Sequence, residues 1–262
     1  MSNTLNLPSN IHPTAKIGKG TIVEPFATIY GDVEIGDNCW IGPNAVICEG
    51  TRIGNNVKIF PGAIVGIVSQ DLKYDGEYTQ TIIGNNTVIR EYVTIHKGTK
   101  DKMMTSIGSD CLLMAYVHIA HDCIVGNHVI IANSVGVSGH VIIDDYAIIE
   151  GMAAVQQFVR IGTHAFVGGA SLVRKNVPPF CKAAREPLSF LGVNTIGLRR
   201  RGYSEIQINN IEDIFRVIYV QNSNISNALK IVDLELPKSD EKDLIVDFIK
   251  SSTKGIMRGY AD

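Results

Sequence analysis

Residues 118–123 (HIAHDC) place two histidines three positions apart, with an aspartate directly after the second. Neutral imidazole accepts a proton near neutral pH, and a nearby carboxylate can hold the ring in place. Histidine and aspartate are also ligands that zinc prefers. The segment is therefore compatible with a proton-transfer site, a metal site or a solvated surface. The choice depends on which other residues the fold brings beside it.

The chain around this segment repeats with a period of six residues. From Ile11 to Val173 there are 28 positions at this spacing, and all except Asp71, Glu77 and Asp101 are Ile, Val or Leu. The residue four places after each aliphatic is small or β-branched. Because the period is even, the aliphatic residue and the residue four places later lie on one face of a strand. An α-helix cannot sustain a six-residue period. The pattern predicts a parallel β-helix, with glycine and asparagine supplying positive φ at its corners.

Two polar segments interrupt the repeat without changing its phase. They are residues 71–82 and residues 101–106, which contain the three exceptions. Insertions in solenoid proteins form loops on one face, often the binding face. We therefore expect both loops near a binding site.

Composition narrows the class of protein. The 262 residues are 45% hydrophobic and 19% charged, with a net charge of −2, which argues against a general nucleic-acid binder. The sequence contains no run of 18 apolar residues, so no membrane span is predicted. The N-terminus does not resemble a signal peptide. Five scattered cysteines fit a reducing compartment better than a disulfide framework. A cytoplasmic location is predicted.

The pattern changes after the two prolines at 178–179. Ser204 and Gln207 form a predicted capping box before apolar residues at helical spacing. A second helix is predicted at 223–235, and a third begins after Ser239. We predict a β-helix over 1–190 and a helical domain over 191–262 that closes the end of the solenoid.

Several motifs, in order along the whole chain, resemble one enzyme family. The chain is similar to the UDP-N-acetylglucosamine O-acyltransferases, which are left-handed parallel β-helices of hexapeptide repeats. The resemblance implies a homotrimer without a cofactor that takes an acyl group from acyl carrier protein in the first step of lipid A synthesis. The matching segments are SQDLKY at 69–74, VTIHKGT at 93–99, HIAHDC at 118–123, SGHV at 138–141, VQQF at 155–158, VGG at 167–169 and GVNTIGLRRRG at 192–202.

In that family three hexads form one coil, so residues 18 positions apart lie one above the other. Gly139 then stacks on His121, and Gln157 follows one coil further on. His140 lies beside this column, and His118 is half a hexad from His121. Removing the six residues 101–106 also places His96 one coil away. We expect these residues at one edge, and we expect the remaining histidines on the surface elsewhere: His12, His128 and His164.

The resemblance also implies roles for residues. His121 matches the general base, and Gly139 matches the backbone N–H that stabilises the oxyanion. Gly169 matches the position that limits acyl length, and as a glycine it implies a long 3-hydroxyacyl chain. Asp122 could orient His121, although neighbours on one strand point to opposite faces. Substrate-binding positions are matched by Asp71, Lys73, His96, His118, His140, Gln157, Asn194, Arg200 and Arg201.

Alternatives stay open. We predict no metal, because a glycine, a glutamine and an acidic insertion share the site with the histidines, but a zinc enzyme or a non-enzymatic scaffold would fit the repeat. A related transferase could use a 3-amino sugar nucleotide or another acyl donor, such as coenzyme A. Gln156 stands where the family usually has histidine, and Ile196 stands where it often has glutamate. Both departures lie on the nucleotide side of the predicted site.

Overall fold

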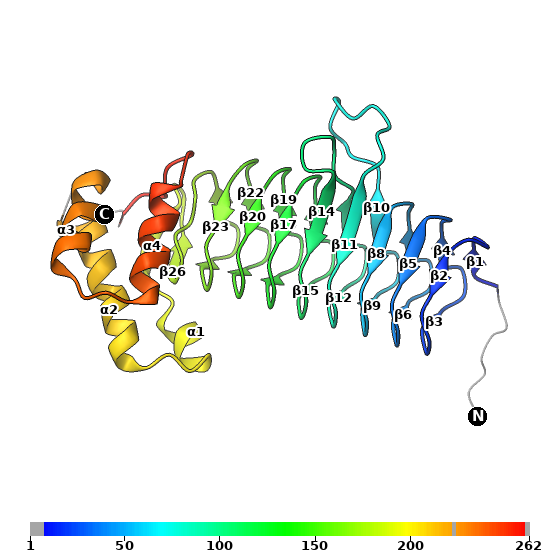
Figure 1. Ribbon diagram of the computed structural model, residues 1–262, viewed down its shortest axis with the longest axis horizontal. Helices are drawn as coiled ribbons and strands as arrows, with labels where there is room; N and C mark the ends of the chain where they lie inside the picture. The colour runs from blue at the N-terminus through cyan, green and yellow to red at the C-terminus, as the bar shows by residue number, and fades with distance from the viewer. Residues whose placement is uncertain (1–7, 222–223, 260–262) are drawn as a thin grey trace.

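The computed structural model describes residues 8–221 and 224–259. Its first part is a three-sided parallel β-helix (Figure 1). Each of the strands β1 to β25 contains one aliphatic position of the six-residue repeat. From Ile29 onward, every one of these aliphatic side chains is buried. The predicted β-helix and its inward-facing positions are confirmed.

Three parallel sheets form the sides. The first sheet contains β1 (Asn10–Ile11), β4 (Thr28–Ile29), β7 (Val46–Ile47), β10 (Ile64–Ile67), β13 (Thr94–His96), β16 (His118–Ile119), β19 (Gly136–Val137), β22 (Ala154–Val155) and β25 (Leu172–Val173). The second contains β2 (Lys16–Ile17), β5 (Val33–Ile35), β8 (Thr51–Ile53), β11 (Gln80–Ile83), β14 (Met104–Ile107), β17 (Ile124–Val125), β20 (Ile142–Ile143) and β23 (Arg160–Ile161). The third contains β3 (Ile22–Val23), β6 (Trp40–Ile41), β9 (Lys58–Ile59), β12 (Val88–Ile89), β15 (Leu112–Leu113), β18 (Ile130–Ile131), β21 (Ile148–Ile149), β24 (Phe166–Val167), β26 (Cys181–Ala184) and β27 (Ser189–Val193).

The corners between the sheets are named here for the site description. The first corner joins the first sheet to the second and includes residues 120–123, 138–141 and 156–159. The second corner joins the second sheet to the third and includes residues 126–129, 144–147 and 162–165. The third corner joins the third sheet to the first and includes residues 150–153 and 168–171.

Glycine and asparagine have different tasks at these corners. Asn38 and Asn56 have φ of 55° and 57°, as predicted. Gly36, directly after a strand, does not have positive φ, so that expectation was wrong for it. A Cβ at Gly36 would lie 2.4 Å from the Oδ1 of Asn55 on the next coil. The glycine is needed there because successive coils approach closely.

The two insertions form loops at the first corner, where they project together from the coils (Figure 1). They occupy residues 68–79, between β10 and β11, and residues 97–103, between β13 and β14. The first loop begins three residues earlier than predicted and the second begins four residues earlier. Residues 80–82 pair with residues 104–106 in the second sheet, so the segments predicted as loop ends are strand.

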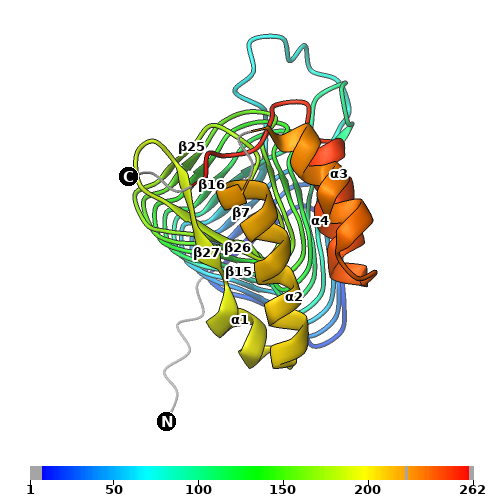
Figure 2. The same ribbon diagram turned by 90° about the vertical axis from the view of Figure 1, so that its left-hand side faces the viewer.

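The C-terminal part begins with an antiparallel hairpin of β26 and β27 that extends the third sheet. The predicted domain boundary at 190/191 therefore falls inside β27. In the described residues four α-helices follow at the end of the coils: α1 (Thr195–Arg200), α2 (Glu205–Arg216), α3 (Ile225–Glu235) and α4 (Asp240–Lys250), with a π-helical turn at Val217–Gln221 (Figure 2).

The predicted helix starts agree well with the structure. Ser204 and Gln207 form the capping box of α2, and the Ser239 side chain caps α4. Asn224 caps α3, so this helix begins two residues later than predicted, and position 223 lies outside the described residues. The short helix α1 was not predicted. Among the described residues, no helix is long and apolar enough to span a membrane.

Candidate active site

His121 lies at the first corner, two residues after the end of β16, and its side chain is buried. Its Nδ1 is 2.8 Å from the Oδ2 of Asp122. A Cβ added to Gly139 would lie 2.6 Å from the His121 ring atoms Cε1 and Nε2. The predicted stacking of Gly139 on His121 is therefore confirmed, and only glycine leaves room for the ring.

Asp122 contacts His121 because the pair lies in a turn. Asp122 has φ of 58°, which brings its side chain beside that of the preceding residue. The argument from opposite faces of a strand was therefore wrong at this position. Burial acts to raise the pKa of the Asp122 carboxyl, but hydrogen bonds from Thr99, His121 and the Lys102 backbone outweigh it and lower the pKa. The group is thus an anion at neutral pH.

Asp122 also holds the second loop in place. Its Oδ1 accepts the backbone N–H of Thr99 at 2.9 Å, and its Oδ2 accepts the Thr99 hydroxyl at 2.7 Å. The Lys102 N–H donates to the same carboxylate at 3.2 Å. The backbone N–H of Lys100 donates to Glu77 in the first loop at 3.0 Å. One buried carboxylate therefore orders both the imidazole and the loop above it.

A groove of about 620 Å³ opens beside His121. The first loop closes one side of it, with the Oδ2 of Asp71 3.9 Å from the Nε2 of His121. Small residues of the first sheet, Gly136 and Ala154, form part of its surface. Six predicted site residues line this groove: Asp71, Lys73, His118, His121, Gly139 and Gln157.

His96 and His118 form a second pair. Their ring centroids are 5.0 Å apart in an edge-to-face arrangement, and His118 Nδ1 lies 2.8 Å from the Thr94 hydroxyl. Burial and the neighbouring His118 lower the pKa of His96 to about 4, and burial also lowers the pKa of His118. Both rings are neutral near pH 7. His96 does not line the groove but lies buried next to His118.

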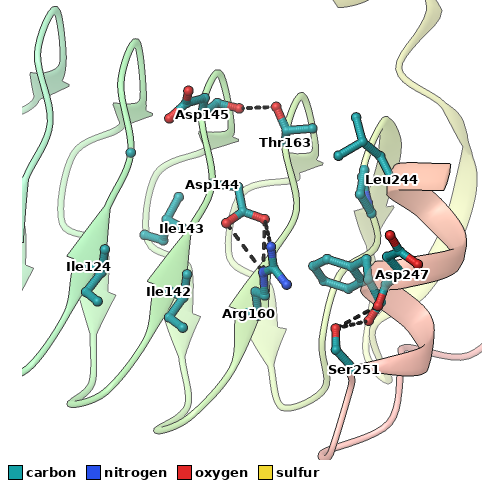
Figure 3. Close-up of a pocket in the computed structure, with 13 residues that line it drawn as sticks. Ile124, Ile142, Ile143, Asp144, Asp145, Arg160, Thr163, Leu244, Asp247 and Ser251 are labelled. Carbon is teal, nitrogen blue, oxygen red and sulfur yellow. Dashed lines mark hydrogen bonds and ion pairs between the residues drawn. The ribbon is translucent and has the colours of Figure 1, made fainter. Parts of the chain in front are cut away.

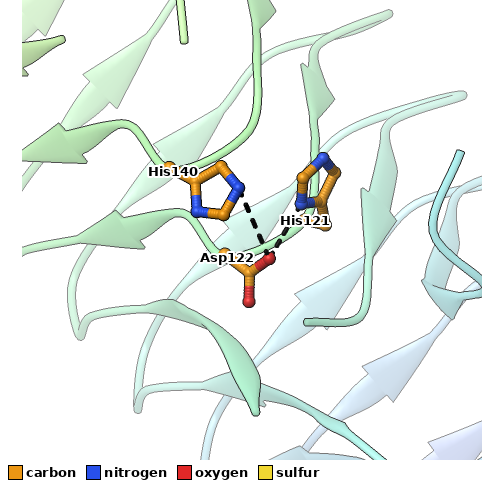
Figure 4. A group of neighbouring side chains, drawn as sticks. All are labelled: His121, Asp122 and His140. Atoms are coloured by element: carbon orange, nitrogen blue, oxygen red, sulfur yellow. Dashed lines mark hydrogen bonds and ion pairs between the residues drawn. The ribbon is translucent and has the colours of Figure 1, made fainter. Parts of the chain in front are cut away.

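His140 approaches the site from the next coil (Figure 4). Its ring is perpendicular to that of His121, with centroids 4.9 Å apart, and it stacks on Phe158 at 4.5 Å. Its Nδ1 lies 3.0 Å from the Asp101 carboxylate, an ion-pair distance without hydrogen-bond geometry. His140 lines a smaller cavity of about 250 Å³ between the two loops, shared with Asp71 and Lys73.

His121, Asp122 and His140 could in principle bind a metal ion, since their potential ligand atoms lie within 4.8 Å of one another (Figure 4). However, Oδ1 of Asp122 accepts hydrogen bonds from Thr99 and Lys102, and Oδ2 contacts His121 and the Thr99 hydroxyl. A carboxylate saturated by the protein suits an oriented imidazole better than a metal ligand.

The predicted nucleotide-side residues lie at the second corner instead. Arg201 lies over the ring of Tyr146, with its Cζ 5.1 Å from the centroid. Asn194 is buried, donates to the His164 carbonyl at 3.0 Å and accepts the Gly197 N–H as the cap of α1. The Asn194 side chain therefore links α1 to the second corner, and its role in substrate binding stays a prediction.

His164 was predicted to be a surface residue, and this prediction was wrong. Its side chain is buried at the second corner, whereas His12 and His128 are exposed, as predicted. A signal was present in the sequence, because His128, Tyr146 and His164 are spaced 18 residues apart. The coil length therefore predicts a column of rings.

Gly169 lies at the third corner, where an added Cβ would be 3.2 Å from the Gly151 carbonyl oxygen. The predicted residues thus occupy three different corners. In the part of the chain that the structure describes, the groove beside His121 contains neither Arg201 nor Gly169.

Known proteins share both parts of this architecture. Residues 176–257 match the model for domain 2 of UDP N-acetylglucosamine O-acyltransferase, and residues 14–47, 32–66 and 104–139 match the bacterial transferase hexapeptide repeat. The acyl-[acyl-carrier-protein]–UDP-N-acetylglucosamine O-acyltransferase of Myxococcus xanthus is 44% identical over 195 residues, which cover 74% of this chain and 76% of that protein.

The chain belongs to the UDP-N-acetylglucosamine O-acyltransferase family.

Solved structures agree with this membership. The UDP-N-acetylglucosamine acyltransferase of Bacteroides fragilis is 46% identical, with a TM-score of 0.93 over 95% of this chain and 98% of that one. The Francisella novicida enzyme is 38% identical, with a TM-score of 0.92 over 95% of this chain and 92% of its own. The resemblance read from the motifs is confirmed, and the chain is an acyltransferase.

One further cavity of this acyltransferase was not predicted from sequence. It measures about 590 Å³ and lies between the second sheet and α4 (Figure 3). Arg160 pairs with Asp144 at 2.9 Å and lies over the Phe248 ring at 4.8 Å. Burial raises the pKa of Asp144 despite this pairing. The contacts dock α4 on the coils, and no predicted site residue lines this cavity.

Proposed function

We propose that this enzyme transfers an (R)-3-hydroxyacyl chain from acyl carrier protein to the 3-hydroxyl of UDP-N-acetylglucosamine in lipid A biosynthesis, with His121 as the general base. One observation carries the proposal. The Nδ1 of His121 is engaged by an anionic Asp122, while its Nε2 faces a groove beside Asp71 and Gly139. A hydrogen bond at Nδ1 fixes the tautomer in which Nε2 accepts a proton.

The reaction balances with these groups. Nε2 of His121 takes the proton of the sugar hydroxyl as its oxygen attacks the thioester carbonyl. The carbonyl oxygen becomes an oxyanion, and collapse of the intermediate breaks the carbon–sulfur bond. The proton then passes from His121 to the departing thiolate, which leaves as a thiol. Asp122 stabilises the imidazolium that forms between these steps.

Gly139 is suited to stabilise the oxyanion. Among the described residues, its backbone N–H donates to no other group, whereas the N–H groups of its neighbours Ser138 and His140 are bound to carbonyls. A free N–H on a rigid coil beside the base matches the requirement for a preorganised donor. Asp71, Lys73, His118, His140 and Gln157 are the proposed contacts to the sugar.

Arg201 is the proposed diphosphate contact, with Arg200 second, because guanidinium groups bind phosphate oxygens with paired N–H donors. The same basic edge is proposed to meet acyl carrier protein, which is acidic. Arg199 is excluded from this role because its guanidinium is engaged by Glu205 at 2.6 and 2.9 Å.

The three-corner arrangement supports a homotrimer. If His121, Arg201 and Gly169 act on one substrate pair, different corners of the β-helix must meet, and neighbouring copies related by closed symmetry would bring them together. Gly169 then limits the acyl length from a neighbouring chain. A cytoplasmic location, where both substrates are expected, stays a prediction.

A 3-amino sugar nucleotide is the second candidate acceptor. Ile196 is 60% exposed on α1 and offers no hydrogen bond where the family often has glutamate. The nucleotide contacts of this chain therefore differ from the family pattern at a position open to solvent.

The test is an acyl-transfer assay with UDP-N-acetylglucosamine, its 3-amino analogue, 3-hydroxyacyl carrier proteins of graded length and the corresponding coenzyme A thioesters. We expect transfer from carrier protein to UDP-N-acetylglucosamine, and a loss of about 1000-fold in kcat for His121→Ala. His12→Ala, which removes an exposed histidine far from the groove, should retain full activity. Full activity of a folded His121→Ala enzyme would contradict the mechanism.

A further inference from the structure

The second corner carries a column of stacked rings that the reaction described above does not use. The rings of His128 and Tyr146 are 4.6 Å apart with an interplanar angle of 8°, and those of Tyr146 and His164 are 4.8 Å apart with an angle of 3°. Phe180 continues the column at 5.7 Å from His164. The coil repeat holds these rings parallel and stacked face to face, so the column is rigid.

Arg201 lies on this column. Its Cζ is 5.1 Å from the Tyr146 centroid, and Tyr203 packs edge-on against His164 at 5.2 Å. Among the described residues, no carboxylate lies within ion-pair distance of Arg201. Arg199, two positions earlier, is bound to Glu205. The chain therefore keeps one arginine of the run in contact with rings and free of carboxylates.

His164 is compatible with this cation because it is neutral. Burial and the neighbouring Arg201 lower the pKa of His164 to about 4. Its Nδ1 is buried without a hydrogen-bond partner among the described residues. Its backbone carbonyl accepts the side-chain N–H of Asn194, the cap of α1. The segment that carries Arg201 is thus attached to the same coil as the rings.

We propose that Tyr146 and His164 form a platform that positions Arg201 for a diphosphate group, with Tyr146 as the principal positioning residue. The inference rests on the proposed role of Arg201 in nucleotide binding. Contact with the Tyr146 ring attracts the guanidinium and restricts its rotamers, which reduces the entropy lost when an anion binds. It does so without a carboxylate that would compete with the phosphate for the N–H donors.

The test is the kinetics of Tyr146→Leu and Tyr146→Phe with UDP-N-acetylglucosamine as the varied substrate. We expect Tyr146→Leu to raise KM about five-fold, the size of one cation–π contact, with kcat nearly unchanged. Tyr146→Phe keeps the ring and should restore the wild-type KM. Tyr116→Leu is the matched control, because it removes a stacked corner tyrosine at 5.3 Å from Tyr92, away from Arg201. Its KM should not change.

A double-mutant cycle separates this role from a purely structural one. If Tyr146 acts through Arg201, Tyr146→Leu should add nothing to the KM of Arg201→Ala. An unchanged KM for Tyr146→Leu, or an additive effect in the Arg201→Ala background, overturns the platform. An unchanged KM for Arg201→Ala itself contradicts the proposed nucleotide contact instead. If Tyr146→Leu does not fold, Tyr146→Gln replaces it under the same criteria.

Discussion

The first and second corners of the β-helix share one backbone turn but differ in their side-chain contacts. Asp122, His140 and Phe158 occupy the positive-φ position at the first corner, with φ between 58° and 64°. His128, Tyr146 and His164 occupy the same position at the second corner, with φ of 56° to 61°.

The contacts diverge because an acidic residue and two loops enter the first corner. There the rings of His121 and His140 are perpendicular, with Asp122 in contact with the first and Asp71 and Asp101 brought in by the loops. His140 and Phe158 stack nearly in parallel at the first corner as well, but at the second corner all three rings, His128, Tyr146 and His164, stack in this way. The repeat thus sets the positions of the side chains, whereas a buried carboxylate and two inserted loops distinguish the corner where proton transfer is proposed.

The largest expected effect comes from filling the space above His121. Gly139→Ala would place a Cβ 2.6 Å from the imidazole, so the ring must move away from the groove. We expect kcat to fall about 1000-fold, since both the base and the oxyanion donor are displaced. Steady-state kinetics and thermal unfolding of the same preparation provide the measurement. A folded variant with normal kcat would show that the stacking is irrelevant to catalysis.

Asp122→Asn should have the next largest effect, because it removes the charge that distinguishes the first corner. We expect kcat to fall about 100-fold through loss of the fixed His121 tautomer. The loop at 97–103 should also exchange its amide hydrogens faster, since Thr99 and Lys102 lose their anionic acceptor. The control is Asp37→Asn, which alters a carboxylate that accepts a backbone N–H at the second corner. An equal decrease in kcat in the two variants would show that the carboxylate of the first corner has no special role.

The smallest effect is on stability and involves one buried histidine near each of these corners. The pKa values of His96 and His164 are lowered from 6.5 to about 4. Between these pH values the two histidines are protonated in the unfolded chain but neutral in the folded chain. The free energy of unfolding should therefore decrease as pH falls from 6.5 toward 4, by about 1 kcal/mol per pH unit for each histidine. Urea unfolding at several pH values measures this slope.

His96→Gln and His164→Gln should each flatten the pH dependence of stability by a similar amount. A steeper loss in either variant would mean that the histidine is protonated in the folded protein.

Much of the first corner could be predicted from the sequence, because the six-residue period, with the three hexads per coil that the family resemblance implies, determines which residues stack. Gly139 above His121 followed directly from the coil length. The sequence made Asp122 a candidate partner of His121 but could not decide the contact, since it depends on a positive-φ turn at an ordinary aspartate. The loop boundaries were displaced because strands in the second sheet extend over polar residues such as Gln80 and Ser106.

At the second corner the sequence was informative but incomplete. The arginine run was visible, but only the structure shows that Arg199 is paired with Glu205 and Arg201 is not. The capping role of Asn194 depends on α1, a helix too short to produce a periodic pattern, and His164 is buried in contact with Phe180 and Tyr203 from the C-terminal part.

Mixed assembly tests most directly the proposal that one reaction uses corners from different copies of the chain. His121→Ala and Arg201→Ala chains, each impaired alone, would be unfolded together, refolded and assayed. If a site combines His121 of one copy with Arg201 of another, random mixing should restore about a quarter of wild-type activity. Activity that never exceeds the average of the two separate variants would contradict the account.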